Sequence, residues 1–245
     1  MTDGELAAKL AKEAGALLIN LRASSGLTGK SLGDAGDAAA NEMLLNLLAN
    51  ERPDDGVLSE ESKDTAERLS NHRVWIIDPL DGTREYKEGR DDWAVHIGLA
   101  IGGVPAEGAV ALPAFDLVLR SDKPIKAPQR SDKPRMVVSR SRPAKEALMI
   151  AKEFGADLIE MGSAGAKAMA VVRGEAEIYL HSGGQYEWDN CAPVAVALAH
   201  GLHCSRIDGS ELLYNQKDTY LPDLLICHKQ DANKILTLIK ANKSS

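Results

Sequence analysis

Residues 75–83 read Trp75-Ile76-Ile77-Asp78-Pro79-Leu80-Asp81-Gly82-Thr83. An apolar strand ends here in two carboxylates with a proline between them. Pro79 fixes its own φ and has no N–H, so the turn can aim both Asp side chains and the Leu80 carbonyl at one point. Such oxygen ligands suit a hard cation such as Mg²⁺. Gly82 permits close backbone approach, and Thr83 adds a hydroxyl at a helical turn that could hold a phosphate oxygen. The alternative is an ordinary strand end followed by an Asp-Gly turn.

Two further acidic stretches stand before and after this one. Glu60 and Glu61 follow a short apolar pair, and Asp189 opens a predicted helix with Pro193 in its first turn. Taken singly, the acidic pair could be a solvated helix start, and Asp189 could be an N-cap. Taken with residues 78–83, they indicate a cluster of carboxylates that binds a metal.

Periodicity and turn residues predict alternating helices and strands on both sides of a break. The break is residues 121–135, which contain three prolines and the sequence SDKP twice, and we expect a loop or an inter-domain connection there. It separates an N-terminal α+β half, 1–130, with most of the acidic residues named above, from a C-terminal α/β half, 131–245, with Asp189; the resemblance described below implies that the C-terminal half also carries the substrate loop. Helices are predicted over 3–22, 37–50, 143–154, 164–173, 190–200 and 231–242, and strands over 74–77, 94–101, 108–112, 116–119, 136–139, 157–161, 176–181, 203–207 and 223–228.

Composition excludes several classes of protein. The chain has 245 residues, 44% of them hydrophobic, which is enough for a substantial core and rules out disorder or a disulfide-stapled scaffold. A net charge of −7 argues against a broad basic surface for a nucleic-acid polymer. No apolar run approaches the ~20 residues needed to span a membrane, and the start lacks the order of a signal peptide. We therefore expect a cytoplasmic protein with no membrane or nucleic-acid partner.

The three acidic stretches, in this order, resemble the magnesium-dependent, lithium-sensitive phosphatases of the inositol monophosphatase superfamily. Asp78 to Tyr86, D-P-L-D-G-T-R-E-Y, resembles the branch that acts on 3′-phosphoadenosine 5′-phosphate. Ser139-Arg140-Ser141 and the G-x-A-G-x-K segment of residues 162–167 resemble that branch's substrate segments. Residues 180–185, the following E-W-D and residues 214–216 are similar to CysQ-type nucleotidases of actinobacteria. One departure is the stretch 113–135, which is short and basic where many relatives carry a longer hairpin region.

The resemblance implies a layered αβαβα sugar-phosphatase fold and two or three Mg²⁺ ions. Their ligands would be Glu60, Asp78, the Leu80 carbonyl, Asp81 and Asp189, with Glu61 as an outer or third-ion residue. Asp37 and Thr83 would orient and deprotonate the attacking water; read alone, Asp37 is a helix N-cap. The substrate would contact Asp81, Gly82, Thr83, Ser139, Arg140, Gly162, Ser163, Lys167 and Asp189.

The activity that the resemblance implies is hydrolysis of the 3′-phosphate of 3′-phosphoadenosine 5′-phosphate to AMP and phosphate, in sulfate activation. Lys167 and Arg140 would bind the second phosphate; the alternative for each is a solvated surface charge. Two other functions remain open. One is inositol monophosphatase or fructose-1,6-bisphosphatase activity on the same metal site, and the other is a catalytically silent phosphonucleotide sensor. A homodimer is a further expectation.

Several apparent signals are set aside. Gly29-Lys30-Ser31 is similar to the end of a P-loop, but the required earlier glycine position is Ser24. The histidines show no metal-ligand spacing, and His96, within a strand, is interpreted as a core residue. The three cysteines lack CxxC spacing, and Cys191 is interpreted as a small packed residue.

Overall fold

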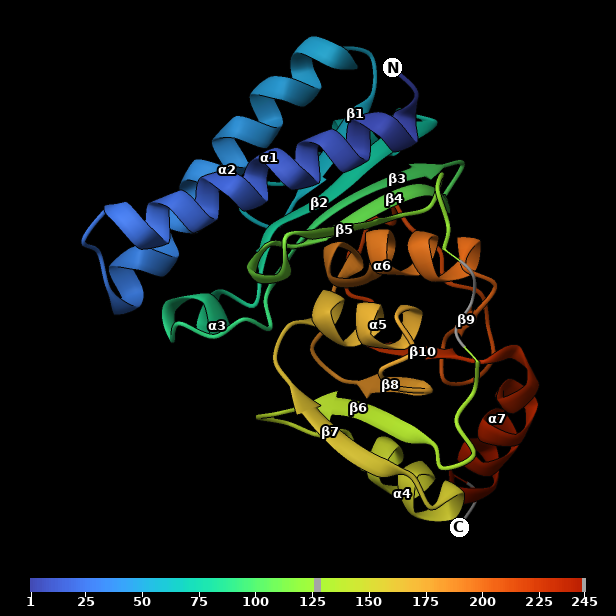
Figure 1. The fold of residues 1–245 in the computed structure, drawn as a ribbon. Coiled ribbons are helices and arrows are strands. Elements are labelled where there is room, and N and C mark those ends of the chain that lie inside the picture. Colours follow the sequence, from blue (N-terminus) through green and yellow to red (C-terminus); the bar gives the residue numbers. More distant parts are fainter. Residues whose placement is uncertain (126–128, 244–245) are drawn as a thin grey trace.

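The computed structural model describes residues 1–125 and 129–243, which form five layers (Figure 1). Helices α1 and α2 cover one face of a first sheet, and α5 and α6 fill the space between its other face and a second sheet. Helices α4 and α7 cover the far face of the second sheet. This is the αβαβα arrangement that the resemblance implies.

The helices are α1 (Asp3–Ser24), α2 (Gly29–Glu51), α3 (Thr83–Lys87), α4 (Lys145–Phe154), α5 (Ala164–Val172), α6 (Glu187–Ala199) and α7 (Lys229–Lys243), with short 3₁₀ turns η1 (Ala66–Ser70) and η2 (Pro113–Phe115). The strands are β1 (Gly56–Ser59), β2 (Arg73–Asp81), β3 (Ala94–Ile101), β4 (Val104–Leu112), β5 (Leu117–Arg120), β6 (Arg135–Ser139), β7 (Asp157–Met161), β8 (Ile178–Ser182), β9 (His203–Ser205) and β10 (Asp223–Cys227).

Both sheets are mixed. The first has the order β1-β2-β3-β4-β5, in which β1 and β2 are parallel and the other pairs are antiparallel. The second has the order β7-β6-β8-β10-β9, in which β6 is parallel to both neighbours and β10 is antiparallel to both of its own. The predicted division at residues 130 and 131 falls between β5 and β6, so each sheet comes from one half of the chain.

The middle layer joins the two halves. Every residue of α5 is buried, and so are most of those of α6, because sheets lie on both sides of these helices. Their side chains share one core cluster with residues from both sheets, including Ile76 of β2 and Val137 of β6. A helix buried on all sides is apolar all round and lacks an amphipathic stripe. The small residues of α5 and α6 let the two sheets pack closely against these helices, so the two halves of the chain meet at this middle layer.

Two helix starts differ from the prediction. Helix α2 begins at Gly29 after Thr28, so Asp37 lies inside the helix and its interpretation as an N-cap is wrong. Three glycines in the first turns of α2 lower its helix propensity, which hid this start in the sequence.

The N-cap of α6 is Tyr186, so the N-cap interpretation of Asp189 is also wrong. Asp189 stands three residues later, and its carboxylate accepts a hydrogen bond of 2.7 Å from the Tyr186 N–H.

Other differences are smaller. Strand β1 was not predicted because only two of its four residues, Val57 and Leu58, are apolar. Strand β4 begins four residues earlier than predicted, directly after the positive-φ pair Gly102 and Gly103 that closes its hairpin with β3. The predicted loop 121–135 is confirmed up to residue 125 and over 129–134, while residues 126–128 lie outside the described residues.

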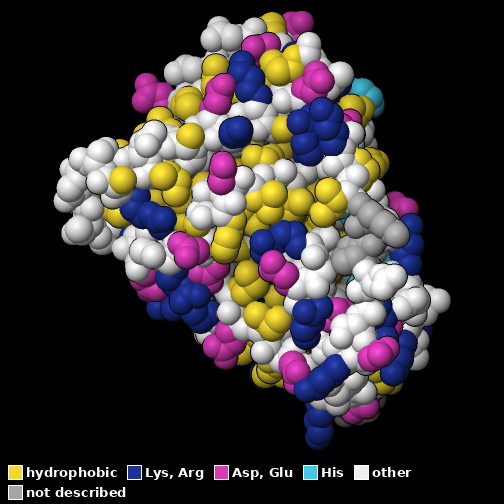
Figure 2. Space-filling model, viewed as in Figure 1, with side chains coloured by type: hydrophobic (Ala, Val, Ile, Leu, Met, Phe, Trp, Pro, Cys, Tyr) yellow, Lys and Arg dark blue, Asp and Glu magenta, His cyan; other side chains and the backbone are white. Residues whose placement is uncertain are grey.

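Among the described residues, no helix combines the length and the apolar character that crossing a bilayer requires. On the face shown in Figure 2, Lys and Arg side chains alternate with Asp and Glu and form no continuous basic patch. This distribution agrees with the negative net charge of the sequence.

Candidate active site

The acidic residues gather where two parallel strands end. Ser59 of β1 is paired with Ile77 of β2, so Glu60, directly after β1, and Asp78 of β2 lie side by side. The pairing of β2 with β3 then shifts by one residue between Asp78 and Asp81, which is a β-bulge around Pro79. A bulge is favourable at Pro79, since proline has no N–H to give to the ladder. The extra residue turns Asp81 toward the same side as Asp78.

Three carboxylates meet at this point. Asp78, Asp81 and Asp189 each place one oxygen within 4.8 Å of the other two. Asp189 reaches the cluster from the first turn of α6. Glu60 adds a fourth carboxyl beside Asp78, and after burial its charge is the largest cause that raises the pKa of Asp78. A set of oxygen donors with this charge fits a hard divalent cation and does not suit a soft metal.

Without a cation, these carboxyls oppose one another. Burial, followed by the charge of Asp189, raises the pKa of Glu60 to about 8. Burial, followed by the charge of Asp81, raises the pKa of Asp189 to about 7. Burial and the neighbouring carboxylates hold the pKa of Asp78 well above its usual range. Positive charge placed among them would favour the ionised forms, so the residues present fit a metal site.

Asp81 behaves differently from its neighbours. It accepts hydrogen bonds from the Ser163 hydroxyl and from the N–H groups of Ala164 and Gly165, the latter two at 3.1 and 2.6 Å. Burial alone would raise the pKa of Asp81, but His96 and these donors outweigh burial and lower it to about 2. The carboxylate therefore stays ionised and also ties the end of β2 to the first turn of α5. In this structure the first-turn amides of α5 bind Asp81, not an outside anion.

His96 is a site residue that the sequence did not reveal. The expectation that it is buried is confirmed, but its Nε2 lies 3.0 Å from Asp81 Oδ2 and its Nδ1 lies 3.0 Å from the Trp188 carbonyl oxygen. A Cβ at Gly165 would overlap the imidazole ring, so glycine is required there. The contact depends on the register of β3, and no local motif reports that register.

The predicted catalytic pair comes together. Thr83 Oγ1 lies 3.3 Å from Asp37 Oδ1 and 3.2 Å from the Leu80 carbonyl oxygen. Helix α2 can come this close because Gly33 faces Thr83; a Cβ there would lie 2.9 Å from the Thr83 methyl group. Burial, followed by the charge of Glu61, raises the pKa of Asp37 to about 7. Asp37 is thus suited to accept a proton near neutral pH.

A cleft of about 230 Å³ opens beside the carboxylates, between the two halves of the chain. Every predicted substrate-binding residue except Thr83 lines it. The cleft also contains charged and polar residues that were not predicted. Its lining consists of Asp81, Gly82, Arg84, Glu85, Ser139, Arg140, Ser141, Arg142, Gly162, Ser163, Ala164, Lys167, His181, Gly184, Gln185 and Asp189.

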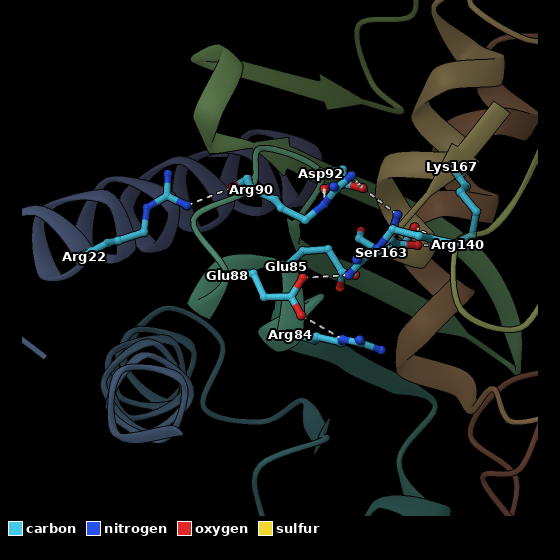
Figure 3. A network of polar contacts seen from close by, with 10 residues as sticks. Arg22, Arg84, Glu85, Glu88, Arg90, Asp92, Arg140, Ser163 and Lys167 are labelled. Carbon is cyan, nitrogen blue, oxygen red and sulfur yellow. Dashed lines mark hydrogen bonds and ion pairs between the residues drawn. The ribbon is translucent and has the colours of Figure 1, made fainter. Parts of the chain in front are cut away.

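Lys167 is not a solvated surface charge, so that alternative is wrong for it, whereas Arg140 is partly exposed and held in ion pairs (Figure 3). Lys167 is buried, and its Nζ donates to the carbonyls of Gly162 and Ser163. Burial lowers the pKa of Lys167 to about 8. Nη2 of Arg140 donates to Glu85 Oε1 at 2.7 Å and to Glu88 Oε2 at 2.9 Å, across the cleft from β6 to α3.

Arg142 is the other functional candidate that was missed. It is exposed and lines the same cleft. Unlike Arg84 and Arg140, it has no carboxylate partner in the described part of the chain. The repeated Ser-Arg of residues 139–142 was the available signal, but its spacing did not say which arginine is already neutralised.

Comparisons with known proteins agree with this geometry. A family model described as "Inositol monophosphatase family" matches residues 4–244. A Mycobacterium leprae protein named 3′-phosphoadenosine 5′-phosphate phosphatase is 49% identical, over 98% of this chain and 94% of that protein. The Mycobacterium tuberculosis protein of the same name is 50% identical, over 93% and 89%. The Escherichia coli 3′(2′),5′-bisphosphate nucleotidase CysQ is 30% identical, over 76% and 81%.

Solved structures show the same fold. The inositol monophosphatase from Anabaena superposes with a TM-score of 0.79 and 24% identity, over 97% of this chain and 95% of that one. CysQ from Bacteroides thetaiotaomicron gives a TM-score of 0.78 and 24% identity, over 91% and 96%. With the family model matching nearly the whole chain, the protein belongs to the inositol monophosphatase family.

Proposed function

We propose that the protein is a Mg²⁺-dependent phosphatase that converts 3′-phosphoadenosine 5′-phosphate to AMP and phosphate. The observation that carries the proposal is that the carboxylate cluster opens into a cleft lined by Arg140, Arg142 and Lys167. The cluster suits the reacting phosphate with its cations, and the far side of the cleft suits a second anionic group. Relatives about 50% identical to the chain bear the name of this activity.

The metal ligands in this proposal are Glu60, Asp78, the Leu80 carbonyl, Asp81 and Asp189. Two or three Mg²⁺ ions would supply the positive charge that stabilises the transferring phosphoryl group and acidifies the attacking water. The protein's own contribution is to hold these oxygens together against their repulsion. It does so from β1, β2 and α6, three elements fixed by the core.

Asp37 and Thr83 act on the water. The hydroxyl of Thr83 has one proton, which it donates to Asp37 or to the Leu80 carbonyl. When it donates to Asp37, its lone pairs can accept a hydrogen bond from water and orient it. The water oxygen then bonds to phosphorus while its proton passes to Asp37, the bond from phosphorus to the ribose 3′ oxygen breaks, and that oxygen takes a proton from solvent. In-line attack of this kind needs no phosphoenzyme.

The second phosphate of the substrate lies, in this proposal, against Ser139 and Arg140, on the cleft wall that Lys167 supports from the backbone side. The binding energy of this phosphate positions the reacting one, because it is remote from the bonds that change. Arg142 is added to this group because its guanidinium is available without breaking an ion pair. Gly162 and Ser163 shape the cleft wall through the backbone that Lys167 holds.

The alternative functions fit less well. Inositol 1-phosphate has no second phosphate to use the cationic wall of the cleft, although the same metal site would serve it. A silent phosphonucleotide sensor would have no need of the Asp37–Thr83 pair. Homodimer formation and a cytoplasmic location stay predictions.

The test is phosphate release from 3′-phosphoadenosine 5′-phosphate, inositol 1-phosphate and fructose 1,6-bisphosphate, each with Mg²⁺ and with EDTA. We expect Mg²⁺-dependent release with the highest kcat/KM on the nucleotide. A higher kcat/KM on either of the other substrates would contradict the substrate assignment. Tight nucleotide binding without phosphate release would favour the sensor.

A further inference from the structure

Arg68 of η1 is a buried arginine in an exposed segment. Within residues 61–70, all of which the structure describes, it is the only buried residue, with 3% of its surface exposed. Its Nε and Nη2 donate to the two carboxylate oxygens of Asp64, both at 2.7 Å. Its Nη1 donates to Asn215 Oδ1 at 2.7 Å, and Nη2 also donates to the Gln216 carbonyl at 3.0 Å. This fork of donors fixes direction as well as distance.

The residues that Arg68 binds are held to the start of α6. The N–H groups of Asn215 and Gln216 donate to the two oxygens of Glu187 at 2.6 and 2.7 Å, and Glu187 is fully buried two residues before Asp189. Asn215 has a φ of 58°, a left-handed conformation that asparagine tolerates. Its side-chain amide donates back to the Arg68 carbonyl at 3.1 Å. The η1 segment and the 214–216 loop therefore each donate hydrogen bonds to the other.

These contacts connect two parts of the carboxylate cluster. The hydrogen bonds run from Asp64 and Arg68, which follow Glu60 and Glu61 in the same segment, to Glu187 in the helix turn that carries Asp189. We propose that Arg68 is a positioning residue for the cation site, holding the Glu60 segment beside the Asp189 turn. The inference rests on the proposed function, since it assumes that these carboxylates bind Mg²⁺.

The physical reason is the repulsion within the cluster. Three carboxylates, Asp78, Asp81 and Asp189, bring oxygens within 4.8 Å of one another, and ionised carboxylates at this separation repel each other when no cation lies between them. The Glu60 N–H donates to the Ile77 carbonyl at 3.3 Å, and the Ser62 hydroxyl accepts from Asn41 at 3.0 Å, so the start of the segment is held to β2 and α2. Residues 63–70 bury only Arg68, and its contacts tie this part of the segment to the turn that carries Asp189. With the Arg68 contacts, the ligands are already arranged before the cation binds, which reduces the ordering cost of binding. Arg68 itself touches neither cation nor substrate.

The test uses Arg68→Gln and Asn215→Gly, since glycine keeps the left-handed backbone at 215 and removes the side chain. For both variants we expect the Mg²⁺ concentration for half-maximal activity to rise by about 10-fold, which is 1.4 kcal/mol. The rate at saturating Mg²⁺ should stay within about threefold of wild type. The Mg²⁺ titration of the melting temperature, which needs no turnover, should shift by the same factor. Asn215→Gly is the milder change and serves if Arg68→Gln folds poorly.

Arg135→Gln is the matched control. Arg135 also binds a buried carboxylate, Glu177, and a backbone carbonyl, but at the opposite end of β6 from Ser139. The Arg135→Gln variant should have a lower melting temperature but the wild-type Mg²⁺ concentration for half-maximal activity. If Arg68→Gln and Asn215→Gly do the same, Arg68 is only structural and the inference is overturned. If the wild type neither melts higher with Mg²⁺ nor releases phosphate with it, the proposed function fails as well.

Discussion

His96 Nε2 lies 3.0 Å from Asp81 Oδ2, and its Nδ1 lies 3.0 Å from the Trp188 carbonyl oxygen. A carbonyl only accepts hydrogen bonds, so Nδ1 carries a proton. One fully buried ring therefore connects β3 with the end of β2 and the start of α6. Both of those segments carry proposed metal ligands, Asp81 and Asp189.

Replacing His96 by alanine should separate these ligands. We expect the loss of its buried contacts to cost about 1–3 kcal/mol of folding free energy. We also expect kcat/KM to fall by at least 10-fold, about 1.4 kcal/mol. Urea unfolding and initial rates measure the two effects. Val110→Ala, at the paired position on β4, is the control: it should lose stability without a comparable fall in kcat/KM. A kcat/KM near wild type in His96→Ala would contradict a positioning role.

Asp78→Asn and Asp81→Asn should both abolish turnover but have opposite effects on stability. Asp78 is repelled by its neighbours, so an uncharged amide should stabilise the metal-free protein at alkaline pH. Asp81 accepts from the hydroxyl of Ser163 and from two N–H groups of α5. An amide NH₂ there would face donors, and we expect a loss of about 1–3 kcal/mol. Thermal melting in EDTA checks this; equal shifts in both variants would contradict it.

The stabilising effect of Mg²⁺ should grow with pH. The ordinary pKa values of Asp189 and Glu60 are 3.8 and 4.5, and the fold raises them to about 7 and about 8. A raised carboxyl pKa means that the folded state holds the proton more tightly. Stability from these groups is complete below pH about 4 and is lost as pH rises through about 8. Mg²⁺ binds the ionised forms and replaces those protons.

The melting temperature should therefore rise more on adding Mg²⁺ at pH about 8.5 than at pH about 5.5. Asp189→Asn removes one of the titrating carboxyls and should reduce the difference between the two pH values. A shift that is independent of pH in the wild type would show that the carboxyl cluster is not where the cation binds.

The order of helices and strands was predictable because its signals are local. Periodicity, caps and turn residues lie within a few positions of one another, and α1 follows its prediction closely. The position of the carboxylates was predictable for the same reason, since Pro79 stands next to them and marks the bulge. The start of α2 was missed because glycines obscure it, although one of them, Gly33, is what lets α2 reach Thr83.

The contacts between distant segments could not be read from the sequence. Arg68 and Asn215 are 147 positions apart, and their pairing depends on how η1 and the 214–216 loop are placed by the core. The burial of Lys167 follows from α5 lying between two sheets, a property of the whole fold. A motif can identify such a lysine as functional without saying that its ammonium binds backbone carbonyls.

Variants of Arg142 and Lys167 should differ in how they change kcat/KM on substrates with and without a second phosphate. Arg142→Ala removes a cation that holds no carboxylate of its own, so the fold should be unchanged. We expect kcat/KM for 3′-phosphoadenosine 5′-phosphate to fall by about 10- to 100-fold, the loss of one charge-assisted hydrogen bond. Activity on inositol 1-phosphate should stay near wild type, since that substrate has no second phosphate.

Lys167→Ala should lower kcat/KM on both substrates. Its Nζ holds the carbonyls of Gly162 and Ser163, and Ser163 in turn contacts Asp81, so its removal loosens a cleft wall that every substrate meets. The ratio of the two kcat/KM values, measured on each variant, is the readout. Arg142→Ala should change this ratio strongly and Lys167→Ala much less. Suppose instead that kcat/KM for the nucleotide falls selectively in Lys167→Ala and not in Arg142→Ala. The second phosphate would then be assigned to Lys167, and Arg142 would be a solvent-exposed charge without a role in substrate binding.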